Sequence, residues 1–422
     1  MMKEEAYISE LESRGIVPGM DSIRRLLREV GDPQNNLPVV HIAGTNGKGS
    51  TFAFLDSILR CSGCKVGRYL SPAINGYREK FQINGSYIEE DELSDLFARI
   101  KEADRRIQER GCPGPTLFEV ETALSFMYFY RNKVDYVLLE TGMGGRDDAT
   151  NVIKKPLLSV ISSISFDHMA WLGDSLSEIA VHKAGIIKPG CPVVASRSAP
   201  EVMQVLRERA REMEAPFTEV APAHILEETP EGTSFTFKDR TFHCPLPGVH
   251  QVENACLALE AGMILLQNEQ EEDLFPILQE GIRRTRWPGR LELLAKDPLF
   301  YRDGAHNIDG VSKLKAFVEK HFTNRRIIYI IGVLKDKEYD EMVRLLVPSA
   351  SVFYVFRPKN KRGLDEEILA ESIRKRGCAA VVFPGVNEAV KKARETCHKE
   401  DVMILCGSLS FMEEMNENVW KQ

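Results

Sequence analysis

The sequence predicts an α/β protein whose larger domain is built on a mostly parallel sheet. Three observations predict this class. The strand-like segment VVHIA leads directly into the glycine-rich segment GTNGKGS at 44–50 and then into a helical run. Apolar strand segments such as DYVLLE and LLSVISSI alternate with amphipathic helical segments, which is typical of parallel strands joined by crossover helices. A fresh series of such strands follows Gly289.

The first part of the chain is predicted to form the larger domain, residues 1–289. A helix starts near Lys48 and ends at about Gly63, where glycine stops the helical pattern. The segment 73–90 has no clear period, and we expect a long functional loop there. The other elements expected are strands at 65–71, 135–140 and 157–164 and helices at 91–110 and 118–131.

The second part is predicted to form a smaller, Rossmann-like α/β domain, residues 290–422. Before it, the alternating segment 233–248 indicates an antiparallel hairpin at the sheet edge. Trp287-Pro288-Gly289 then breaks the helical period. The strands expected after this break are 327–334, 351–356, 379–385 and 401–408.

Composition limits the classes of function. The 422 residues carry a net charge of -7, which argues against nucleic acid as a main partner. No apolar run reaches the length of a membrane span, and the first residues lack a signal-peptide pattern. Nine scattered cysteines are typical of a reducing compartment. We therefore expect a cytoplasmic protein that does not act at membranes. We also expect a monomer with small-molecule substrates.

The segment 44–50 is predicted to bind phosphates, although it departs from the common phosphate-loop motif. A common phosphate loop has glycine six residues before the lysine and Ser or Thr after it, whereas Ile42 and Gly49 occupy these positions here. The segment can still bind phosphate, because the backbone N–H groups of a glycine-rich loop and the N-terminus of a helix both attract phosphate oxygens. Lys48 adds a mobile charge, and Ser50 or Thr51 a hydroxyl.

Polar residues that follow the predicted strands are candidates for a metal site. Ser71, Glu140 and His168 each come after a different strand, and ligands of parallel sheets lie beyond the carboxyl ends of strands. A hydroxyl, a carboxylate and an imidazole near phosphates indicate Mg²⁺, although histidine is an uncommon ligand for this hard ion.

The residues alone leave two further positions open. Lys183 lies on a predicted helix, and its pattern favours a solvated face. Asp303 follows a predicted strand of the second domain, where a carboxylate binds ribose hydroxyls or caps the next helix.

Six motifs together resemble the folylpolyglutamate synthase and dihydrofolate synthase family, part of the ATP-dependent Mur ligases. They are, in chain order, GTNGKGS, Ser71-Pro72, ETGMGGRDDATN, SFDH, HKAGIIKPG and DGAHN. The resemblance implies an ATP-dependent amide ligase. Such an enzyme adds L-glutamate to the carboxylate of a folate or of dihydropteroate through an acyl phosphate.

The resemblance also implies a role for each matching residue. ATP is expected at Asn46, Gly47, Lys48, Gly49, Ser50, Asn254, Arg290 and Asp303. Two Mg²⁺ ions are implied, with Ser71, Glu140, His168 and a carbamylated Lys183 as their ligands. The catalytic residues would be Lys48, Lys183 and His306. The pterin-bearing substrate is expected at Thr116, Phe118, Glu119, Asp148, Ala149 and Thr150.

Two departures and two alternatives stay open at this stage. Ala73 stands where the family commonly has histidine, and Asp147 where leucine is common, so the preferred folate is open. One alternative is a peptidoglycan-precursor ligase for a UDP-linked substrate. Such ligases carry an extra N-terminal domain, whereas 43 residues precede Gly44. The other is a non-catalytic ATP-binding relative. Dihydrofolate synthesis, polyglutamylation, the chain length and the linkage are not separated by the sequence.

Overall fold

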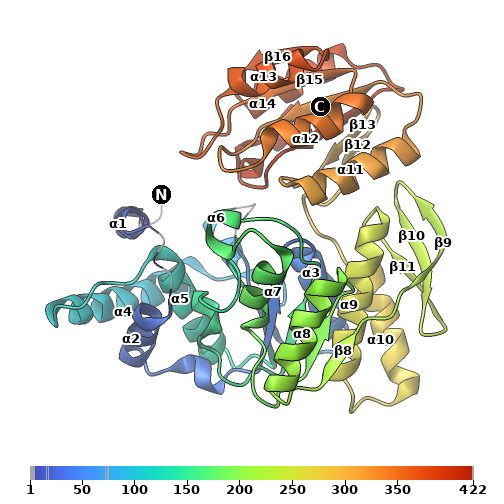
Figure 1. Ribbon diagram of the computed structural model, residues 1–422. Helices are drawn as coiled ribbons and strands as arrows, with labels where there is room; N and C mark the ends of the chain where they lie inside the picture. Colours follow the sequence, from blue (N-terminus) through green and yellow to red (C-terminus); the bar gives the residue numbers. More distant parts are fainter. Residues whose placement is uncertain (1–4, 16, 18, 72, 74–75, 421–422) are drawn as a thin grey trace. The chain divides into compact units, whose positions relative to one another are not determined.

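The computed structural model describes residues 5–15, 17, 19–71, 73 and 76–420. Contacts divide the chain into two compact units (Figure 1). Unit 1 comprises Met1–Ser71, Tyr77–Pro222 and Glu253–Arg284, and unit 2 comprises Pro72–Gly76, Ala223–Val252 and Thr285–Gln422. By contacts, Ala223–Val252 therefore groups with the later residues, and the division into 1–289 and 290–422 stays a prediction.

Unit 1 contains a large sheet with the strand order β4-β3-β2-β5-β1-β6-β7-β8. Only the β2–β3 and β3–β4 pairs are antiparallel, which confirms the mostly parallel sheet. The strands are β1 Val39–Ala43, β2 Val66–Tyr69, β3 Phe81–Ile83, β4 Ser86–Tyr87, β5 Tyr136–Glu140, β6 Leu158–Ile161, β7 Val193–Ala195 and β8 Phe217–Glu219.

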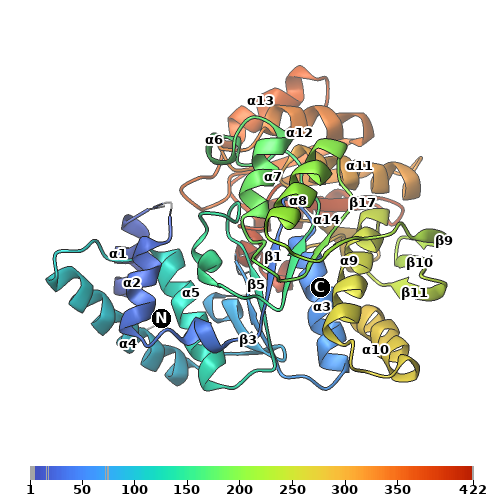
Figure 2. The same cartoon turned by 60° about the horizontal axis from the view of Figure 1, so that its bottom comes forward.

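The helices of this part of the chain are interleaved with the strands. Figure 2 shows α5 and α3 on opposite sides of β1 and β5, as expected for crossover connections. The helices are α1 Glu5–Ser13, α2 Asp21–Glu29, α3 Lys48–Cys61, α4 Glu90–Glu109, α5 Leu117–Arg131, α6 Met169–Leu172, α7 Leu176–Ala184, α8 Pro200–Glu212, α9 Val249–Leu265 and α10 Glu271–Arg284.

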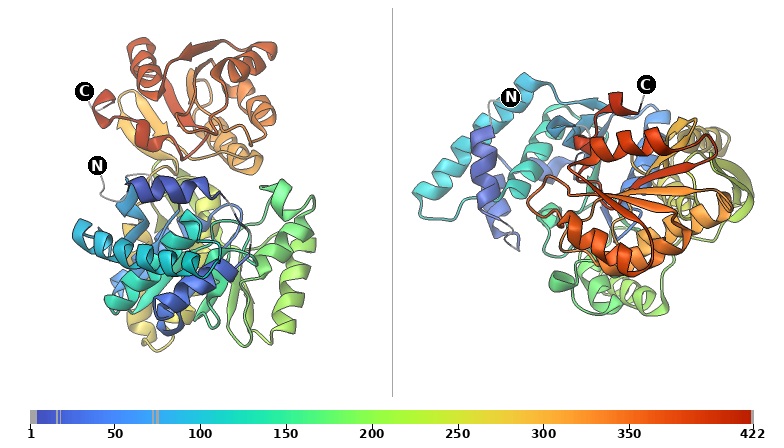
Figure 3. Two further views of the ribbon diagram at one scale, coloured as in Figure 1. Left: turned by 90° about the vertical axis from the view of Figure 1, so that its left-hand side faces the viewer. Right: turned by 90° about the horizontal axis from the view of Figure 1, so that it is seen from above.

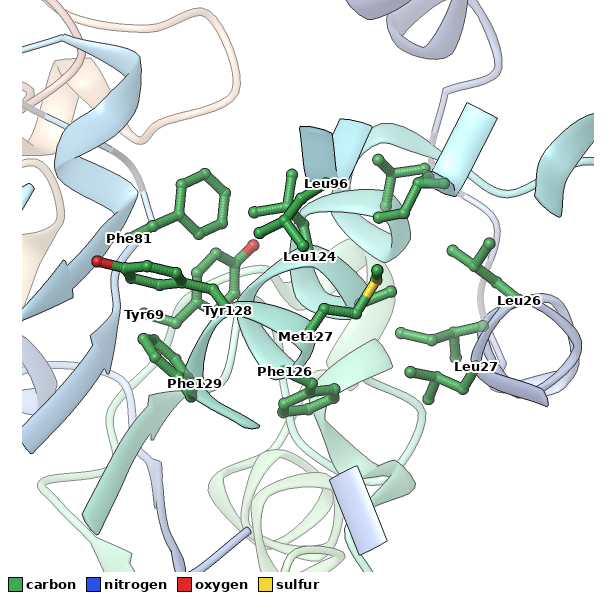
Figure 4. Packing of buried hydrophobic residues seen from close by; sticks show 14 of the residues in the cluster. Leu26, Leu27, Tyr69, Phe81, Leu96, Leu124, Phe126, Met127, Tyr128 and Phe129 are labelled. Atoms are coloured by element: carbon green, nitrogen blue, oxygen red, sulfur yellow. The ribbon is translucent and has the colours of Figure 1, made fainter. Parts of the chain in front are cut away.

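The core beside β2 and β5 forms around α5, which is buried along nearly its whole length. A helix that buries side chains on nearly all sides must be enclosed by other elements. Leu26 and Leu27 of α2 point toward Met127 of α5, and Phe126 lies beside them (Figure 4). Each such side chain contributes about 1.5–3 kcal/mol on full burial. This packing holds α5, whose N-terminus carries predicted site residues.

Two predicted elements are corrected. The segment 73–90 was expected to be a loop, but β3 and β4 form a short antiparallel hairpin within it. Their turn is Asn84-Gly85, and both residues have positive φ, which is the usual chemistry of a two-residue hairpin turn. The hairpin expected at 233–248 does form, but it belongs to a separate three-stranded sheet and not to the edge of the large one.

Unit 2 contains both this small sheet and a six-stranded sheet of order β12-β13-β17-β14-β15-β16, parallel except for β12. Helices cover both faces of the larger sheet (Figure 3), which confirms the predicted second α/β sheet.

The strands of unit 2 are β9 His224–Thr229, β10 Gly232–Phe237, β11 Arg240–Cys244, β12 Glu292–Lys296, β13 Leu299–Arg302, β14 Ile327–Ile331, β15 Val352–Phe356, β16 Ala380–Phe383 and β17 Val402–Cys406. Its later helices are α11 Ile308–His321, α12 Tyr339–Leu346, α13 Glu366–Lys375 and α14 Val386–Thr396.

An ion pair with a buried carboxylate joins the small sheet of unit 2 to α11. Glu228 of β9 has a side chain only 4% exposed, and it accepts hydrogen bonds from Lys320 at 2.6 Å and His321 at 3.3 Å. A buried carboxylate needs such partners, because desolvation penalises an uncompensated charge. Among the described residues, no helix is long and apolar enough to cross a membrane.

Candidate active site

The phosphate loop lies between β1 and α3, as the sequence predicts. Gly47 has φ +84° and is the N-cap of α3, so the helix begins at Lys48. A Cβ on Gly47 would lie 2.2 Å from Oδ1 of Asn254. Glycine is therefore required twice, for its backbone conformation and for this close approach. The contact also places Asn254, a predicted ATP residue, directly beside the loop.

The loop is braced by the segment that follows β6. The backbone N–H of Thr45 donates to the carbonyl of Ser163 at 2.8 Å, and the hydroxyl of Ser162 donates to the carbonyl of Asn46 at 2.8 Å. The hydroxyl of Thr45 donates to the carbonyl of Ser165 at 2.9 Å. These bonds hold the loop in one shape before any phosphate arrives. The support of the loop by these serines was not predicted from the sequence, although their position at the end of a strand indicated that they lie near it.

Two lysines converge inside the loop. Nζ of Lys48 donates to the carbonyl oxygens of Gly44 at 3.1 Å and Thr45 at 3.2 Å, and lies 3.9 Å from the carboxylate of Glu140. Nζ of Lys183 donates to the same Gly44 oxygen at 2.8 Å. Lys48 and Glu140 thus meet where the sequence predicted.

The expectation that Lys183 lies on a solvated helix face is wrong. Its side chain is 3% exposed, because α7 turns it toward β1 and the loop. Burial, reinforced by the charge of Lys48, lowers the pKa of Lys183 to about 7. The helical period could not reveal this, since a face turned to a buried loop has the same polar pattern as one turned to water.

The three predicted metal ligands follow three elements of the sheet. Tyr69 pairs with Leu139, so Ser71 and Glu140 leave β2 and β5 at the same edge. His168 comes later than expected, as the exposed N-cap of α6, because β6 ends at Ile161. The described residues include no cluster of three or more His, Cys, Asp or Glu side chains placed to hold a metal. The donors fit an Mg²⁺ ion that takes its other ligands from phosphates and water.

The start of α5 is held by a capping box. The hydroxyl of Thr116 accepts from the backbone N–H of Glu119, whose Oε2 accepts from the backbone N–H of Thr116 at 2.7 Å. Oε1 of Glu119 accepts from the backbone N–H of Ile23 in α2 at 3.0 Å. Both carboxylate oxygens of Glu119 therefore bind the backbone, which fixes Thr116 and Phe118. Substrate contact by Glu119 itself stays a prediction.

The other predicted substrate residues gather around the loop after β5. Phe118 packs on Gly142, where a Cβ would come within 2.6 Å of its ring. The carboxylate of Asp148 accepts from the backbone N–H of Met143 at 2.8 Å and from the hydroxyl of Thr150 at 2.6 Å. Ala149 and Thr150 are buried in the short 3₁₀ turn Ala149–Val152. The ring of Phe118 and the carboxylate of Asp148 thus both contact the segment 142–143.

The predicted residues of unit 2 form their own group. The carboxylate of Asp303 accepts from the backbone N–H groups of Leu291 at 2.8 Å and Ala305 at 2.9 Å, and burial raises its pKa. The N-cap of α11 is Asn307, so Asp303 does not cap that helix. Nδ1 of His306 donates to the carbonyl of Gly304 at 2.8 Å, and a Cβ on Gly304 would come within 2.6 Å of Arg290. The turn therefore brings Arg290, Asp303 and His306 together.

Two family models match most of the chain. Residues 42–262 match the Mur ligase middle domain, and residues 289–409 match the Mur ligase glutamate ligase domain. The dihydrofolate synthase/folylpolyglutamate synthase of Bacillus subtilis is 40% identical over 341 residues, 79% of this chain and 79% of that protein. The enzyme of the same name from Mycobacterium tuberculosis is 33% identical and covers 84% of this chain and 77% of its own.

The chain belongs to the dihydrofolate synthase/folylpolyglutamate synthase family. This confirms the fold class and the class of ATP-dependent glutamate ligase predicted from the motifs. The family's folylpolyglutamate synthase from M. tuberculosis, solved with ADP and AMPPCP, superposes with a TM-score of 0.87 at 28% identity over 100% of both chains. E. coli FolC in complex with DHPP and ADP superposes with a TM-score of 0.85 at 29% identity, over 97% of this chain and 95% of its own.

Proposed function

We propose that this chain joins L-glutamate to the carboxylate of dihydropteroate or of a folate, at the expense of ATP. The substrate carboxylate attacks the γ-phosphorus of ATP and releases ADP, which leaves an acyl phosphate. The amine of glutamate then attacks the acyl carbon and releases inorganic phosphate. The observation that supports this best is the loop 44–50 of this chain, where Lys48 and Lys183 both donate to the carbonyl oxygen of Gly44.

Within this proposal the chain's own residues orient and neutralise charge. The backbone of 44–50 and the side chain of Lys48 hold the transferred phosphate, since phosphoryl transfer depends chiefly on positioning and electrostatic stabilisation. Asn254, against Gly47, and the turn with Arg290 and Asp303 contact the nucleotide. Phe118 stacks on the flat pterin ring, and Asp148 accepts its N–H groups. His306 serves the ATP or glutamate end.

Mg²⁺ is proposed at Ser71, Glu140 and His168, where it would neutralise phosphate charge. We propose that Lys183 is carbamylated and so contributes a carboxylate toward a second Mg²⁺. Two features support this. The lysine is buried, and its pKa of about 7 leaves much of the amine neutral and able to react with carbon dioxide.

A cytoplasmic monomer stays a prediction. Among the relatives, the folylpolyglutamate synthases of Bos taurus and Cricetulus griseus carry the description mitochondrial. The peptidoglycan-precursor alternative is not favoured, because the curated relatives described above are folate ligases.

The test is to incubate the protein with ATP, glutamate and Mg²⁺, together with dihydropteroate in one arm and tetrahydrofolate in the other. Mass spectrometry of the products should reveal a gain of one glutamate residue in either arm, with ADP and phosphate in equal amounts. A series of gains from tetrahydrofolate would establish polyglutamylation. No gain in either arm, with a folded protein that binds ATP, would favour the non-catalytic alternative.

A further inference from the structure

A histidine is buried in the middle of β1, whose other side chains are all apolar. His41 is 0% exposed, between Leu139 of β5 and Ser159 of β6. Its Nε2 lies 2.9 Å from the hydroxyl of Thr150, and its Nδ1 has no hydrogen-bond partner among the described residues. Burying an imidazole with one orphaned nitrogen costs free energy, so its single remaining bond calls for an explanation.

The hydroxyl of Thr150 is shared between His41 and Asp148. It lies 2.6 Å from Oδ1 of Asp148, which also accepts the backbone N–H of Thr150 at 3.0 Å. Oδ2 of Asp148 accepts the backbone N–H of Met143 at 2.8 Å. Burial raises the pKa of Asp148, and the hydrogen bonds from Thr150 and Met143 oppose this shift by favouring the ionised carboxylate. The hydroxyl of Thr150 gives its proton to Oδ1 of Asp148.

This assignment fixes the proton on His41. A threonine hydroxyl has one proton, so once that proton is directed to Asp148 the oxygen can only accept from the imidazole. Nε2 of His41 must then carry the hydrogen, and Nδ1 must be bare. Burial, with the charge of Lys188 as a smaller cause, lowers the pKa of His41 to about 3, so the ring is neutral at neutral pH. The chain of donors runs in one direction, from His41 through Thr150 to Asp148.

We propose that His41 is a positioning residue for the pterin-bearing substrate, acting through Thr150 on Asp148. The ring donates to Thr150, and this keeps the hydroxyl proton on Oδ1 of Asp148. Asp148 then stays in the orientation that Met143 and Thr150 define, and this sets how it meets the substrate. The inference rests on the proposed function, because it takes Asp148 as the acceptor for the ring.

The test compares variants that differ only in this donor. His41→Leu removes the donor with little loss of volume, and His41→Gln keeps an N–H group near the position of Nε2. Thr150→Val removes the hydroxyl, whereas Thr150→Ser keeps it. Ser159→Ala is the matched control, since Ser159 is a buried neighbour whose hydroxyl donates to the carbonyl of Ile186. The readouts are the KM for dihydropteroate, the KM for ATP, and the melting temperature.

We expect His41→Leu and Thr150→Val each to raise the KM for dihydropteroate about tenfold, as loss of a hydrogen bond that supports a charged group predicts. The KM for ATP should change less than about twofold. His41→Gln and Ser159→Ala should stay near the parent, and Thr150→Ser should raise the KM for dihydropteroate less than Thr150→Val does. The double variant His41→Leu/Thr150→Val should be no worse than either single variant, because both break the same chain.

Equal increases of both KM values, or additive effects in the double variant, would overturn the proposal. If His41→Leu fails to fold, the Thr150→Val and Thr150→Ser pair decides alone. A parent protein without ligase turnover would contradict the proposed function instead, so the two failures are distinguishable.

Discussion

Lys48 and Lys183 donate to one carbonyl oxygen, that of Gly44, at 3.1 and 2.8 Å. Two ammonium groups on a single acceptor repel each other, and the buried one is the easier to neutralise. Burial, followed by the charge of Lys48, lowers the pKa of Lys183 to about 7. The loop thus holds a lysine whose amine exchanges its proton near neutral pH, beside the lysine that is proposed to bind phosphate.

Replacing Lys183 should remove the ligase activity, and a small carboxylate should partly replace the missing carbamate. Lys183→Ala removes the proposed carbamate, so turnover should fall by on the order of 10²-fold or more. Formate or acetate should restore part of the rate by supplying a carboxylate in the vacated space. Carbon-13 NMR with labelled bicarbonate should give a carbamate signal in the parent protein that Lys183→Ala lacks. Full activity of the alanine variant would exclude the role.

Replacing Lys48 should affect chemistry and not folding. Lys48→Ala removes a charge that binds two carbonyl oxygens of the loop, and no core contact. We expect turnover to fall by on the order of 10³-fold with a melting temperature close to the parent. Lys154→Ala, at an exposed position in the same unit, is the control and should keep its activity. Near-normal turnover of Lys48→Ala would contradict the phosphate-loop assignment.

Gly47 and Gly63 offer a matched pair, because they flank α3 with φ values of +84° and +86°. Alanine at either position carries the same backbone strain, about 1–2 kcal/mol. At Gly63 the new Cβ meets nothing within 4 Å, whereas at Gly47 it would lie 2.2 Å from Asn254. Gly47→Ala should therefore weaken ATP binding at least about tenfold by calorimetry, a loss of some 1.4 kcal/mol. Gly63→Ala should only lower the melting temperature. Similar ATP affinities in both variants would refute a role for the Gly47–Asn254 contact.

His41 should give the protein a specific loss of stability in acid. Its pKa is about 3 in the folded chain, against roughly 6.5 when unfolded. Between these values the unfolded state binds a proton that the folded state does not, so the free energy of unfolding falls as pH drops from 6.5 toward 3. The slope from this group is at most about 1.4 kcal/mol per pH unit.

Urea unfolding of the parent protein and of His41→Gln across this window should differ in that slope. The carboxylates titrate in both proteins and cancel in the comparison. His224→Gln is the control, since His224 is exposed and its loss should leave the slope unchanged. Parallel curves for the parent protein and His41→Gln would mean that His41 is protonated in the folded state.

The sequence predicted elements well where pattern and chemistry agree. β1, the phosphate loop and α3 were located to within a residue or so, because a glycine-rich turn between a strand and a helix has few other uses. The β3–β4 hairpin was missed although Asn84-Gly85 signals it, since each strand is too short to display alternation. The separate sheet of β9–β11 could not be foreseen, because register within a hairpin does not tell which sheet it joins.

Site residues were harder to predict than elements, because the type of a residue does not reveal which other parts of the fold will hydrogen-bond to its side chain. Both oxygens of Glu119, an expected substrate residue, accept backbone N–H groups, which only the paths of α2 and α5 could reveal. Its contact with substrate stays a prediction. His41 drew no attention within the strand, since its role depends on Thr150, more than a hundred residues away. Lys183 was misjudged from its helix pattern and was assigned a role only through the family resemblance.

The contact of Glu228 with Lys320 and His321 limits where the chain can be divided into expression fragments. An expression fragment that starts at residue 290 would keep Lys320 and His321 but lose the strand that carries their carboxylate. A fragment that ends at 289 would keep Glu228 without Lys320 and His321. Each fragment would then lack one side of this contact, and a carboxylate without its partners destabilises the fold. Separate production of the later unit should therefore graft residues 223–252 onto its N-terminus through a linker.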